Sequence, residues 1–313
     1  MDEQKSTVVI KRLLIVGGTG FIGSHLCQKA LEQRYAVTVI SLREPTKKSS
    51  EIEYLTVDLN DLDAMQHLLR ERSFEYVVNC SGYIDHSHYS SGGQVSIYSH
   101  FDAIRNLLEC LDQKCLIRFV QIGSSDEYGN ACAPQQEIFR EAPISPYSFA
   151  KVASTHFLQM LWRTEQFPAV ILRLFLVYGP GQNEKRFVPQ IIQGCMNENY
   201  FPVSLGSQLR DLCYVEDIVE GILHTLHANN VCGEIINLAS GFPISIRAVI
   251  EKIQNLMGSG NPQFGQLPFR IGENMALYAD VLKAKQLLNW HPKMTLQVGL
   301  ERTIAYYRTL LYA

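Results

Sequence analysis

The chain carries a tyrosine and a lysine four residues apart, a spacing that can support proton transfer. They lie in the run Pro146-Tyr147-Ser148-Phe149-Ala150-Lys151, where the proline is typical of a helix start. Side chains at i and i+4 share a helix face, and an ammonium beside a phenol lowers the phenol's ordinary pKa of about 10. Tyr147 and Lys151 are therefore candidate catalytic residues that move a proton to or from an alcohol or carbonyl oxygen. In isolation, a packed tyrosine and a surface lysine are the better explanation of this spacing, which becomes far more specific downstream of a dinucleotide-binding motif.

A serine upstream is the third candidate catalytic residue. Ser124 follows the apolar run Arg118–Ile122, within Gly123-Ser124-Ser125-Asp126-Glu127-Tyr128-Gly129. Ligands bind at the carboxyl ends of strands in open parallel sheets, where a hydroxyl can hydrogen-bond a reacting oxygen. The alternative is that Ser124 only forms a turn.

A glycine-rich turn near the start of the chain has the spacing of a dinucleotide site. Gly17, Gly20 and Gly23 lie between an apolar run, Arg12–Val16, and a stretch of helical periodicity. The first two glycines allow a tight turn and close approach to a pyrophosphate, and the third lets helix and strand pack closely. The candidate cofactor-binding residues of this turn are Gly17, Thr19, Gly20, Phe21, Ile22 and Gly23.

The end of the second predicted strand favours NADP(H). NAD usually calls for an acidic residue there to hold the ribose 2′-hydroxyl, but the chain has Ser41 and Arg43, which suit a 2′-phosphate. NAD(H) is the alternative if Glu44 points inward. Cys80, Ser81 and Gly82, after the fourth predicted strand, are further candidates for cofactor binding.

The elements that must position these residues alternate between strand and helix. The predicted strands are Arg12–Val16, Ala36–Ile40, Tyr54–Val57, Tyr76–Cys80, Arg118–Ile122, Ala169–Phe175 and Gly233–Leu238; the predicted helices include Leu62–Arg70, Val95–Leu111 and Tyr147–Thr164. This order predicts an α/β fold of the Rossmann type, a doubly wound parallel sheet. After about residue 176 the pattern loosens into Gly- and Pro-rich segments. We therefore expect a dinucleotide-binding domain at 1–173 and a smaller, irregular substrate domain at 174–313, with about 213–241 returning to the first.

Composition excludes several classes of partner. Lys and Arg number 28 and Asp and Glu 31, a net charge of −3, which disfavours nucleic-acid binding. No apolar run reaches the roughly 20 residues of a membrane span, and residues 1–5 are too polar for a signal peptide. The eight cysteines form no C-x-x-C pair, and His86 and His88 lie in a polar loop, so we expect no metal. These features indicate a cytoplasmic protein.

Together the motifs resemble the NAD(P)-dependent epimerase/dehydratase family of extended short-chain dehydrogenase/reductases, which act on nucleotide-sugars. The resemblance spans nearly the whole chain, from the glycine turn and the Ser124, Tyr147 and Lys151 set to Tyr178-Gly179-Pro180-Gly181-Gln182, Arg210–Asp217, Asn237–Gly241 and Leu288–Pro292. It implies that Asp58 and Leu59 line the adenine and that Arg210 reaches the substrate's nucleotide or phosphate, unless Arg210 pairs with Asp211 or Asp217. The other substrate-binding residues it implies are Ser125, Asp126, Tyr178, Gln182 and Val188. It also implies a homodimer through a four-helix bundle of the helices near 95–111 and 147–164.

The resemblance leaves the reaction open. Dehydratases of the family carry Thr-Asp-Glu with the Thr four residues before Tyr-Gly; here that position is Ser124, and the acidic pair Asp126-Glu127 comes one residue late. This pattern is similar to 4-keto-6-deoxy-sugar reductases. We therefore predict NADPH-dependent reduction of the C4 keto group of a nucleotide-linked 4-keto-6-deoxy or dideoxy hexose. The alternatives are a 4-epimerase or 4,6-dehydratase with tightly bound NAD(P), or a non-catalytic NADPH-binding regulator. His100 stands where the family commonly has an asparagine that supports the lysine.

Overall fold

A parallel seven-stranded sheet forms the centre of the molecule. The computed structural model describes residues 10–197, 200–269 and 272–311; the polar segment 1–5 lies outside them. Within these ranges the strand order is β10-β6-β5-β4-β1-β2-β3, with every pairing parallel. The strands are β1 (Arg12–Val16), β2 (Ala36–Ser41), β3 (Ile52–Thr56), β4 (Tyr76–Asn79), β5 (Arg118–Ser124), β6 (Ala169–Leu174) and β10 (Ile235–Leu238). The predicted Rossmann-type class is confirmed.

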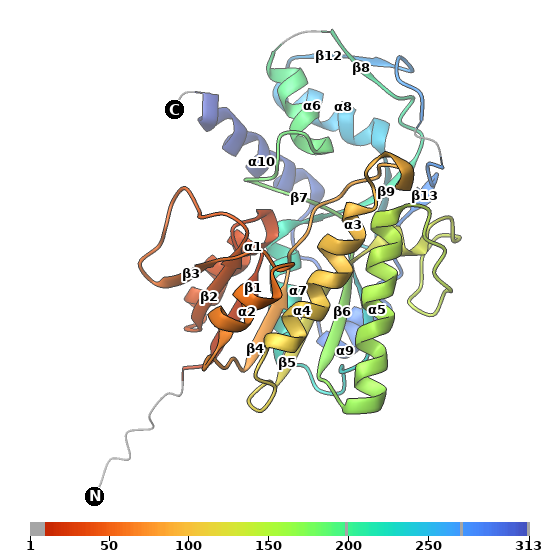
Figure 1. The fold of residues 1–313 in the computed structure, drawn as a ribbon. Helices are drawn as coiled ribbons and strands as arrows, with labels where there is room; N and C mark the ends of the chain where they lie inside the picture. Colours follow the sequence, from red (N-terminus) through yellow and green to blue (C-terminus); the bar gives the residue numbers. More distant parts are fainter. Residues whose placement is uncertain (1–9, 198–199, 270–271, 312–313) are drawn as a thin grey trace, which may run out of the picture.

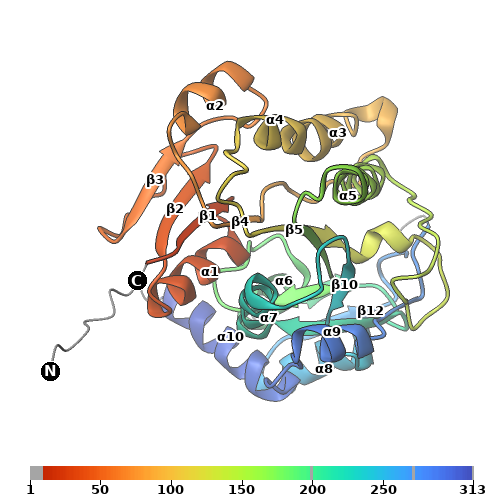
Figure 2. The same cartoon turned by 90° about the horizontal axis from the view of Figure 1, so that it is seen from below.

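Consecutive apolar residues in the strands serve two cores, one on each face of the sheet. In β1, Leu13 and Ile15 belong to one buried cluster and Leu14 and Val16 to the other. The first cluster is covered by α1 (Phe21–Glu32), α7 (Val215–His227) and α9 (Leu282–Leu288); the second is covered by α2 (Leu62–Leu69), α4 (Ala103–Cys110) and α5 (Pro146–Glu165). Figure 2 shows these helices on opposite sides of the sheet. Because both faces are buried, apolar side chains need not alternate along a strand.

The stretch predicted as one helix over 95–111 is interrupted. It comprises α3 (Val95–Ile97), a π-helical turn η2 (Tyr98–Asp102) and α4. A π turn accommodates one extra residue within a helix, so the chain stays helical across this stretch although the hydrogen-bond pattern changes. The buried His100 lies on this turn.

The second half of the chain is more regular than the sequence predicts. Three helices, α6 (Phe187–Met196), α8 (Ile246–Met257) and α10 (Leu296–Leu311), pack around their own apolar core. Beside them lie one small sheet of β7 (Leu176–Tyr178), β9 (Leu209–Tyr214), β11 (Pro243–Ser245) and β13 (Ala276–Leu277), and the pair β8 (Tyr200–Val203) and β12 (Asn261–Phe264). The sequence does not reveal these strands, because they have only two to six residues, are interspersed with Gly and Pro, and carry little periodicity.

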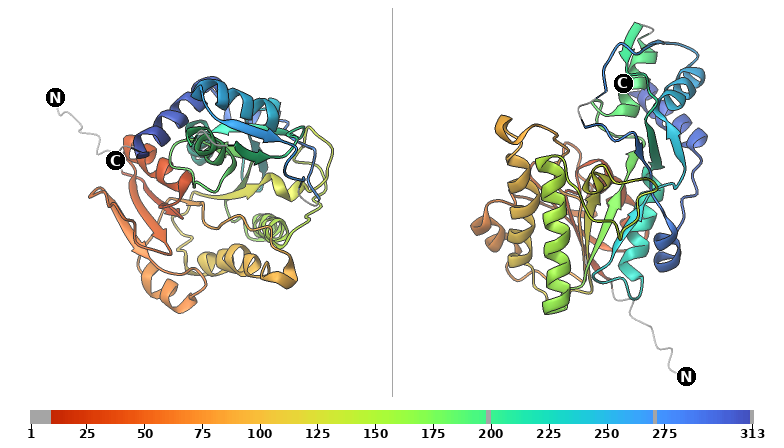
Figure 3. Two further views of the ribbon diagram at one scale, coloured as in Figure 1. Left: turned by 90° about the horizontal axis from the view of Figure 1, so that it is seen from above. Right: turned by 90° about the vertical axis from the view of Figure 1, so that its right-hand side faces the viewer.

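The smaller unit lies over the carboxyl ends of the central strands (Figures 1 and 3). The predicted strand near 233–238 is confirmed: β10 pairs with β6, so the chain returns to the central sheet after β9. The domain boundary at 173 stays a prediction. None of the helices in the described ranges has the length and apolar character needed to cross a bilayer. Over the same ranges, no three His, Cys, Asp or Glu side chains gather as metal ligands.

Candidate active site

The glycine turn between β1 and α1 forms a backbone cradle that only glycine permits. A Cβ built on Gly23 would lie 2.3 Å from the Gly17 carbonyl oxygen, and one on Gly17 would lie 2.9 Å from the backbone of Ser81. Gly17 also has φ +78°, and no side chain caps the start of α1 after Gly20. Uncapped N–H groups at a helix start and a close-approach turn suit a pyrophosphate, so the residues fit a dinucleotide.

The adenosine-side candidates lie at and just after the carboxyl ends of β2 and β3. Ser41 Oγ donates to the Arg43 carbonyl (2.8 Å), and the Arg43 side chain is exposed. Glu44 is also exposed and pairs with Lys48. Asp58 accepts the Asn60 N–H, and the Leu59 carbonyl accepts from Asn106. The exposed Arg43 and the Glu44–Lys48 pair do not distinguish a ribose 2′-hydroxyl from a 2′-phosphate. The NADP(H) preference therefore stays a prediction.

The segment after β4 connects the cradle to the catalytic residues. Ser81 donates through both Oγ and N–H to Asn79 Oδ1, and Asn79 in turn donates to Gln121. Gly82 lies against the His100 ring, where an added Cβ would meet Cε1 at 2.1 Å. Burial raises the pKa of the Cys80 thiol to about 12, which keeps it neutral.

The structure brings Ser124, Tyr147 and Lys151 together. Ser124 is the last residue of β5, and the other two lie in the first turns of α5, which Ser145 caps and Pro146 begins. Tyr147 and Lys151 are 4% and 5% exposed. Lys151 Nζ donates to the Ile122 carbonyl (2.9 Å), and burial lowers its pKa to about 8.

The tyrosine is kept protonated by its surroundings. Burial and then the charge of Asp126 raise the pKa of Tyr147 well above its usual value, while a hydrogen bond with Ser124 acts in the opposite direction. Lys151 Nζ lies 6.0 Å from the Tyr147 ring centroid. The sequence predicts a lowered pKa for this phenol; the structure differs because desolvation outweighs the nearby ammonium.

Two histidines flank the Tyr147 ring edge-on. The ring centroid of His100 lies 5.1 Å from that of Tyr147, and His86 lies 5.9 Å away. His100 Nε2–H donates to the Tyr83 carbonyl, and burial together with the charge of Lys151 lowers the pKa of His100 to about 3. His86 Nε2 lies 3.7 Å from Asp126 Oδ2.

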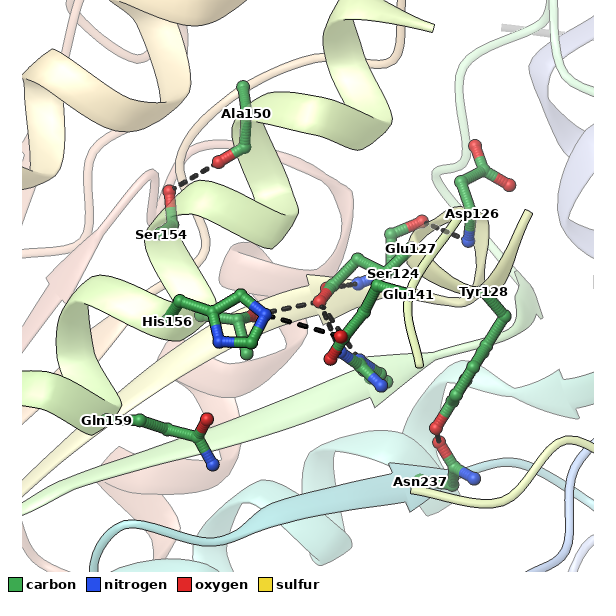
Figure 4. A network of polar contacts seen from close by, with 12 residues as sticks. Ser124, Asp126, Glu127, Tyr128, Glu141, Ala150, Ser154, His156, Gln159 and Asn237 are labelled. Atoms are coloured by element: carbon green, nitrogen blue, oxygen red, sulfur yellow. Dashed lines mark hydrogen bonds and ion pairs between the residues drawn. The ribbon is translucent and has the colours of Figure 1, made fainter. Parts of the chain in front are cut away.

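The two neighbouring carboxylates, Asp126 and Glu127, face different environments (Figure 4). Glu127 is fully buried: Oε1 accepts the Ser124 N–H, and Oε2 accepts from Thr155 Oγ1 and the Arg173 guanidinium. Arg173, also fully buried, contacts Glu141 as well (2.6 Å). The side chain of Asp126 is 29% exposed. The pattern Ser124-x-x-Glu127 is a capping box, a signal in the sequence that would have assigned Glu127 to the turn η3 (Ser125–Tyr128).

The predicted substrate residues differ in how much surface they present. Tyr178 and Val188 are each 1% exposed and pack in the core of the smaller unit, and their contact with a substrate stays a prediction. Ser125 is also buried. Gln182 Nε2 donates to the Val177 carbonyl. Arg210 forms an ion pair with Glu273 and donates to the Asn274 carbonyl, rather than pairing with Asp211 or Asp217.

Comparison with known proteins decides the family. The sequence profile of the NAD dependent epimerase/dehydratase family matches residues 13–239, most of the chain. The protein belongs to this family. It is accordingly a nicotinamide-dependent enzyme of the extended short-chain dehydrogenase/reductase class that acts on nucleotide sugars.

Similar proteins include UDP-sugar epimerases and dTDP-glucose 4,6-dehydratases; a dehydratase of Haemophilus influenzae is 25% identical, with 94% of this chain and 97% of that protein covered. An uncharacterized UDP-glucose epimerase of Bacillus subtilis is 28% identical, with 96% of this chain and 98% of that protein covered. A UDP-glucuronate 4-epimerase of Thermodesulfobacterium geofontis is 26% identical, with coverage of 93% and 94%. The solved UDP-glucuronic acid 4-epimerase of Bacillus cereus, in complex with UDP-glucuronic acid and NAD, is 27% identical, with a TM-score of 0.85 and coverage of 96% and 99%.

Proposed function

We propose that the protein is an NAD-dependent 4-epimerase of a UDP-linked hexose. The observation that carries this proposal is the pairing of Tyr147 with Ser124 beside the cradle, with one carboxylate, Asp126, at the partly exposed end of the loop. The similar proteins named as UDP-sugar 4-epimerases support the same reaction. The proposal therefore differs from the prediction made from the sequence alone, which is reduction of a 4-keto sugar.

The complete burial of Glu127 argues against a 4,6-dehydratase. Loss of water across C5–C6 needs a base for the C5 proton and an acid for the C6 hydroxyl. Glu127 is engaged by Arg173 and Thr155 inside the protein, where it cannot meet a sugar. Restoring the second carboxylate to the site would require breaking a buried ion pair, which costs about 3–5 kcal/mol.

The chain's own residues carry the proton chemistry. The glycine turn would hold the pyrophosphate of NAD, which when bound supplies a site that accepts and returns hydride. Tyr147 takes the proton of the C4 hydroxyl as C4 is oxidised and returns it when C4 is reduced. The Ser124 hydroxyl hydrogen-bonds the same oxygen and stabilises charge that develops there. Lys151 places an ammonium beneath Tyr147 that favours the phenolate when the phenol must act as a base.

Cofactor identity and redox balance test the proposal directly. The nucleotide released from the purified, heat-denatured protein is identified by chromatography, and UDP-glucose is followed by NMR for its C4 epimer. We expect NAD to be released, the epimer to form without added cofactor, and Tyr147→Phe to lower kcat at least about 100-fold. Stoichiometric oxidation of added NADPH with a 4-keto-6-deoxy sugar, and no epimer, would show that the reductase interpretation and the Arg43 argument are right instead.

We also propose a homodimer through the α3–α4 and α5 face. These helices lie side by side on the outside of the molecule (Figure 2), and the face carries exposed apolar side chains, namely Val95, Tyr98, Phe149 and Met160. Leu158, by contrast, is buried in the core and cannot contribute. Light scattering should give twice the mass of one chain, and Phe149→Glu should halve it. An unchanged mass in that variant would place any interface elsewhere.

A further inference from the structure

The buried ring of His100 is in contact with three neighbours. Nε2–H donates to the Tyr83 carbonyl (2.8 Å), and because a carbonyl oxygen only accepts, this bond selects one tautomer of the ring. The Gly82 backbone lies against the same ring, since a Cβ built on Gly82 would come within 2.1 Å of Cε1 and 2.5 Å of Nδ1. The third neighbour is the Tyr147 ring, met edge-on at a centroid distance of 5.1 Å. The imidazole therefore has little freedom to move.

The segment after β4 lies between this ring and the glycine turn. On one side, a Cβ built on Gly17 would approach Cα and N of Ser81 at 2.9 Å. On the other side, the adjacent Gly82 meets the His100 ring. Because neither glycine has a side chain, backbone and ring approach closely at both points. A continuous chain of contacts thus runs from the dinucleotide cradle through Ser81 and Gly82 to His100, and from His100 to Tyr147.

The π turn η2 is also joined to the helix that carries Tyr147. Ser154 Oγ, on α5, lies within hydrogen-bonding distance of the His100 carbonyl (3.3 Å). π turns often occur at functional sites, because they redirect a side chain within a helix. The His100 ring and the Tyr147 phenol are therefore held by two elements that contact each other through backbone as well as side chains.

His100 is unsuited to proton transfer. Burial and the charge of Lys151 lower the pKa of His100 to about 3, so the ring is uncharged at neutral pH. A neutral imidazole has one N–H, and the Tyr83 carbonyl already accepts it. What remains to the ring is to hold its neighbours in place.

We propose that His100 is a positioning residue that sets the separation between the dinucleotide cradle and the Tyr147 phenol. The catalytic part of this inference rests on the proposed C4 epimerisation. When C4 is oxidised, the proton leaves the C4 oxygen and hydride leaves C4 itself, so the proton acceptor and the cradle must be held at a fixed separation. A misplacement of about 1 Å can cost about 100-fold in rate.

Two variants separate the ring from its hydrogen bond. His100→Gln keeps a donor for the Tyr83 carbonyl but loses the ring; at saturating NAD it should lower kcat about 10- to 100-fold, with KM for UDP-glucose within about threefold. His100→Phe keeps a ring without the donor and should restore most of kcat. A proton-relay role predicts instead that both variants are equally slow and that the pH profile of kcat loses a limb. His100→Asn serves if His100→Gln does not fold.

Binding of NAD to the nucleotide-free protein gives a readout that does not depend on turnover. Because the ring supports the segment beside the cradle, His100→Gln should raise the Kd for NAD at least about fivefold, measured by calorimetry. The exposed His88→Gln is the matched control and should leave both Kd and kcat unchanged. If His100→Gln weakens NAD binding but the wild type forms no epimer, the proposed function fails while the positioning role at the cradle stands.

A double-mutant cycle with Gly82→Ala tests the contact itself. The added methyl group would clash with the ring in the wild type but not in His100→Gln, whereas the strain of alanine at φ +108° is present in both backgrounds and cancels. We expect Gly82→Ala to raise the Kd for NAD at least about fivefold more in the wild type than in His100→Gln. Additive effects in this cycle, an unchanged Kd or kcat in His100→Gln, or a His100→Phe variant as slow as His100→Gln would each overturn the inference.

Discussion

The Arg173 guanidinium contacts the Glu127 carboxylate at 2.9 Å, with both side chains completely buried behind Ser124. Through its other oxygen, Glu127 accepts the Ser124 N–H, so the ion pair fixes the backbone that carries a catalytic hydroxyl. Nearby charges raise the pKa of Arg173 despite its burial, so the guanidinium stays charged. The ion pair that Arg173 of β6 forms with Glu127 thereby positions the Ser124 hydroxyl at the end of β5.

Removing the acid from this pair should be costly. Glu127→Ala leaves the buried Arg173 with Glu141 as its remaining carboxylate contact, and we expect a loss of about 3–5 kcal/mol in the free energy of unfolding. Urea denaturation measures it. Glu32→Ala, which breaks the exposed pair with Lys29, is the matched control and should cost about 0–1 kcal/mol. Equal losses in the two variants would contradict a structural role for the buried pair.

Lys151 should lower the stability of the folded protein although it is needed for activity. Its pKa falls from 10.5 to about 8 on folding, so at neutral pH the folded protein holds a cation that it disfavours. Lys151→Met should therefore raise stability at pH 7 by about 1–3 kcal/mol while abolishing turnover. The gain should shrink as pH rises from about 8 and disappear near 10.5, where the lysine is neutral in both states. A destabilised variant at pH 7 would show that the hydrogen bond to Ile122 outweighs desolvation.

His100 should make the fold sensitive to acid. Its folded pKa of about 3 lies below the ordinary 6.5, so between these values the unfolded chain binds a proton that the folded chain does not. Stability is thus lost as pH falls, by up to about 1.4 kcal/mol per pH unit. His100→Gln, which can still donate to the Tyr83 carbonyl, should flatten the thermal-stability profile between pH 6 and 4. The exposed His88→Gln should leave the slope as in the wild type; a similar slope in both variants would refute the effect.

Gly23→Ala should distort the glycine turn and so weaken binding of the dinucleotide. The added Cβ would lie 2.3 Å from the Gly17 oxygen and 2.7 Å from Gly18 Cα, so backbone must move. We expect the purified variant to carry at most about a tenth of the wild-type content of bound nucleotide. Gln28→Ala, exposed on the same helix, should retain the full content. Full retention in the glycine variant would mean that the turn does not hold the cofactor.

Local sequence signals are sufficient to predict the strands and helices that carry the glycine turn, Tyr147 and Lys151. β1, α1 and α5 have strong periodicity and clear start signals, so Gly23, Tyr147 and Lys151 were placed correctly on them. The direction of Glu127 depends on Arg173, 46 residues away, which no local pattern shows. Burial likewise reversed the expected pKa shift of Tyr147, because desolvation is a property of tertiary packing. Tyr178 belongs to a recognisable motif, yet packing against Tyr214 places it in a core.

The return of the chain to β10 means that the central sheet cannot be completed from the first half of the sequence. A fragment ending at residue 173 would lack β10, so the peptide groups on the β10 side of β6 would be unpaired, while those on the other side still pair with β5. Such a bare edge invites pairing with other chains, so the excised half should precipitate rather than bind nucleotide as an independent module.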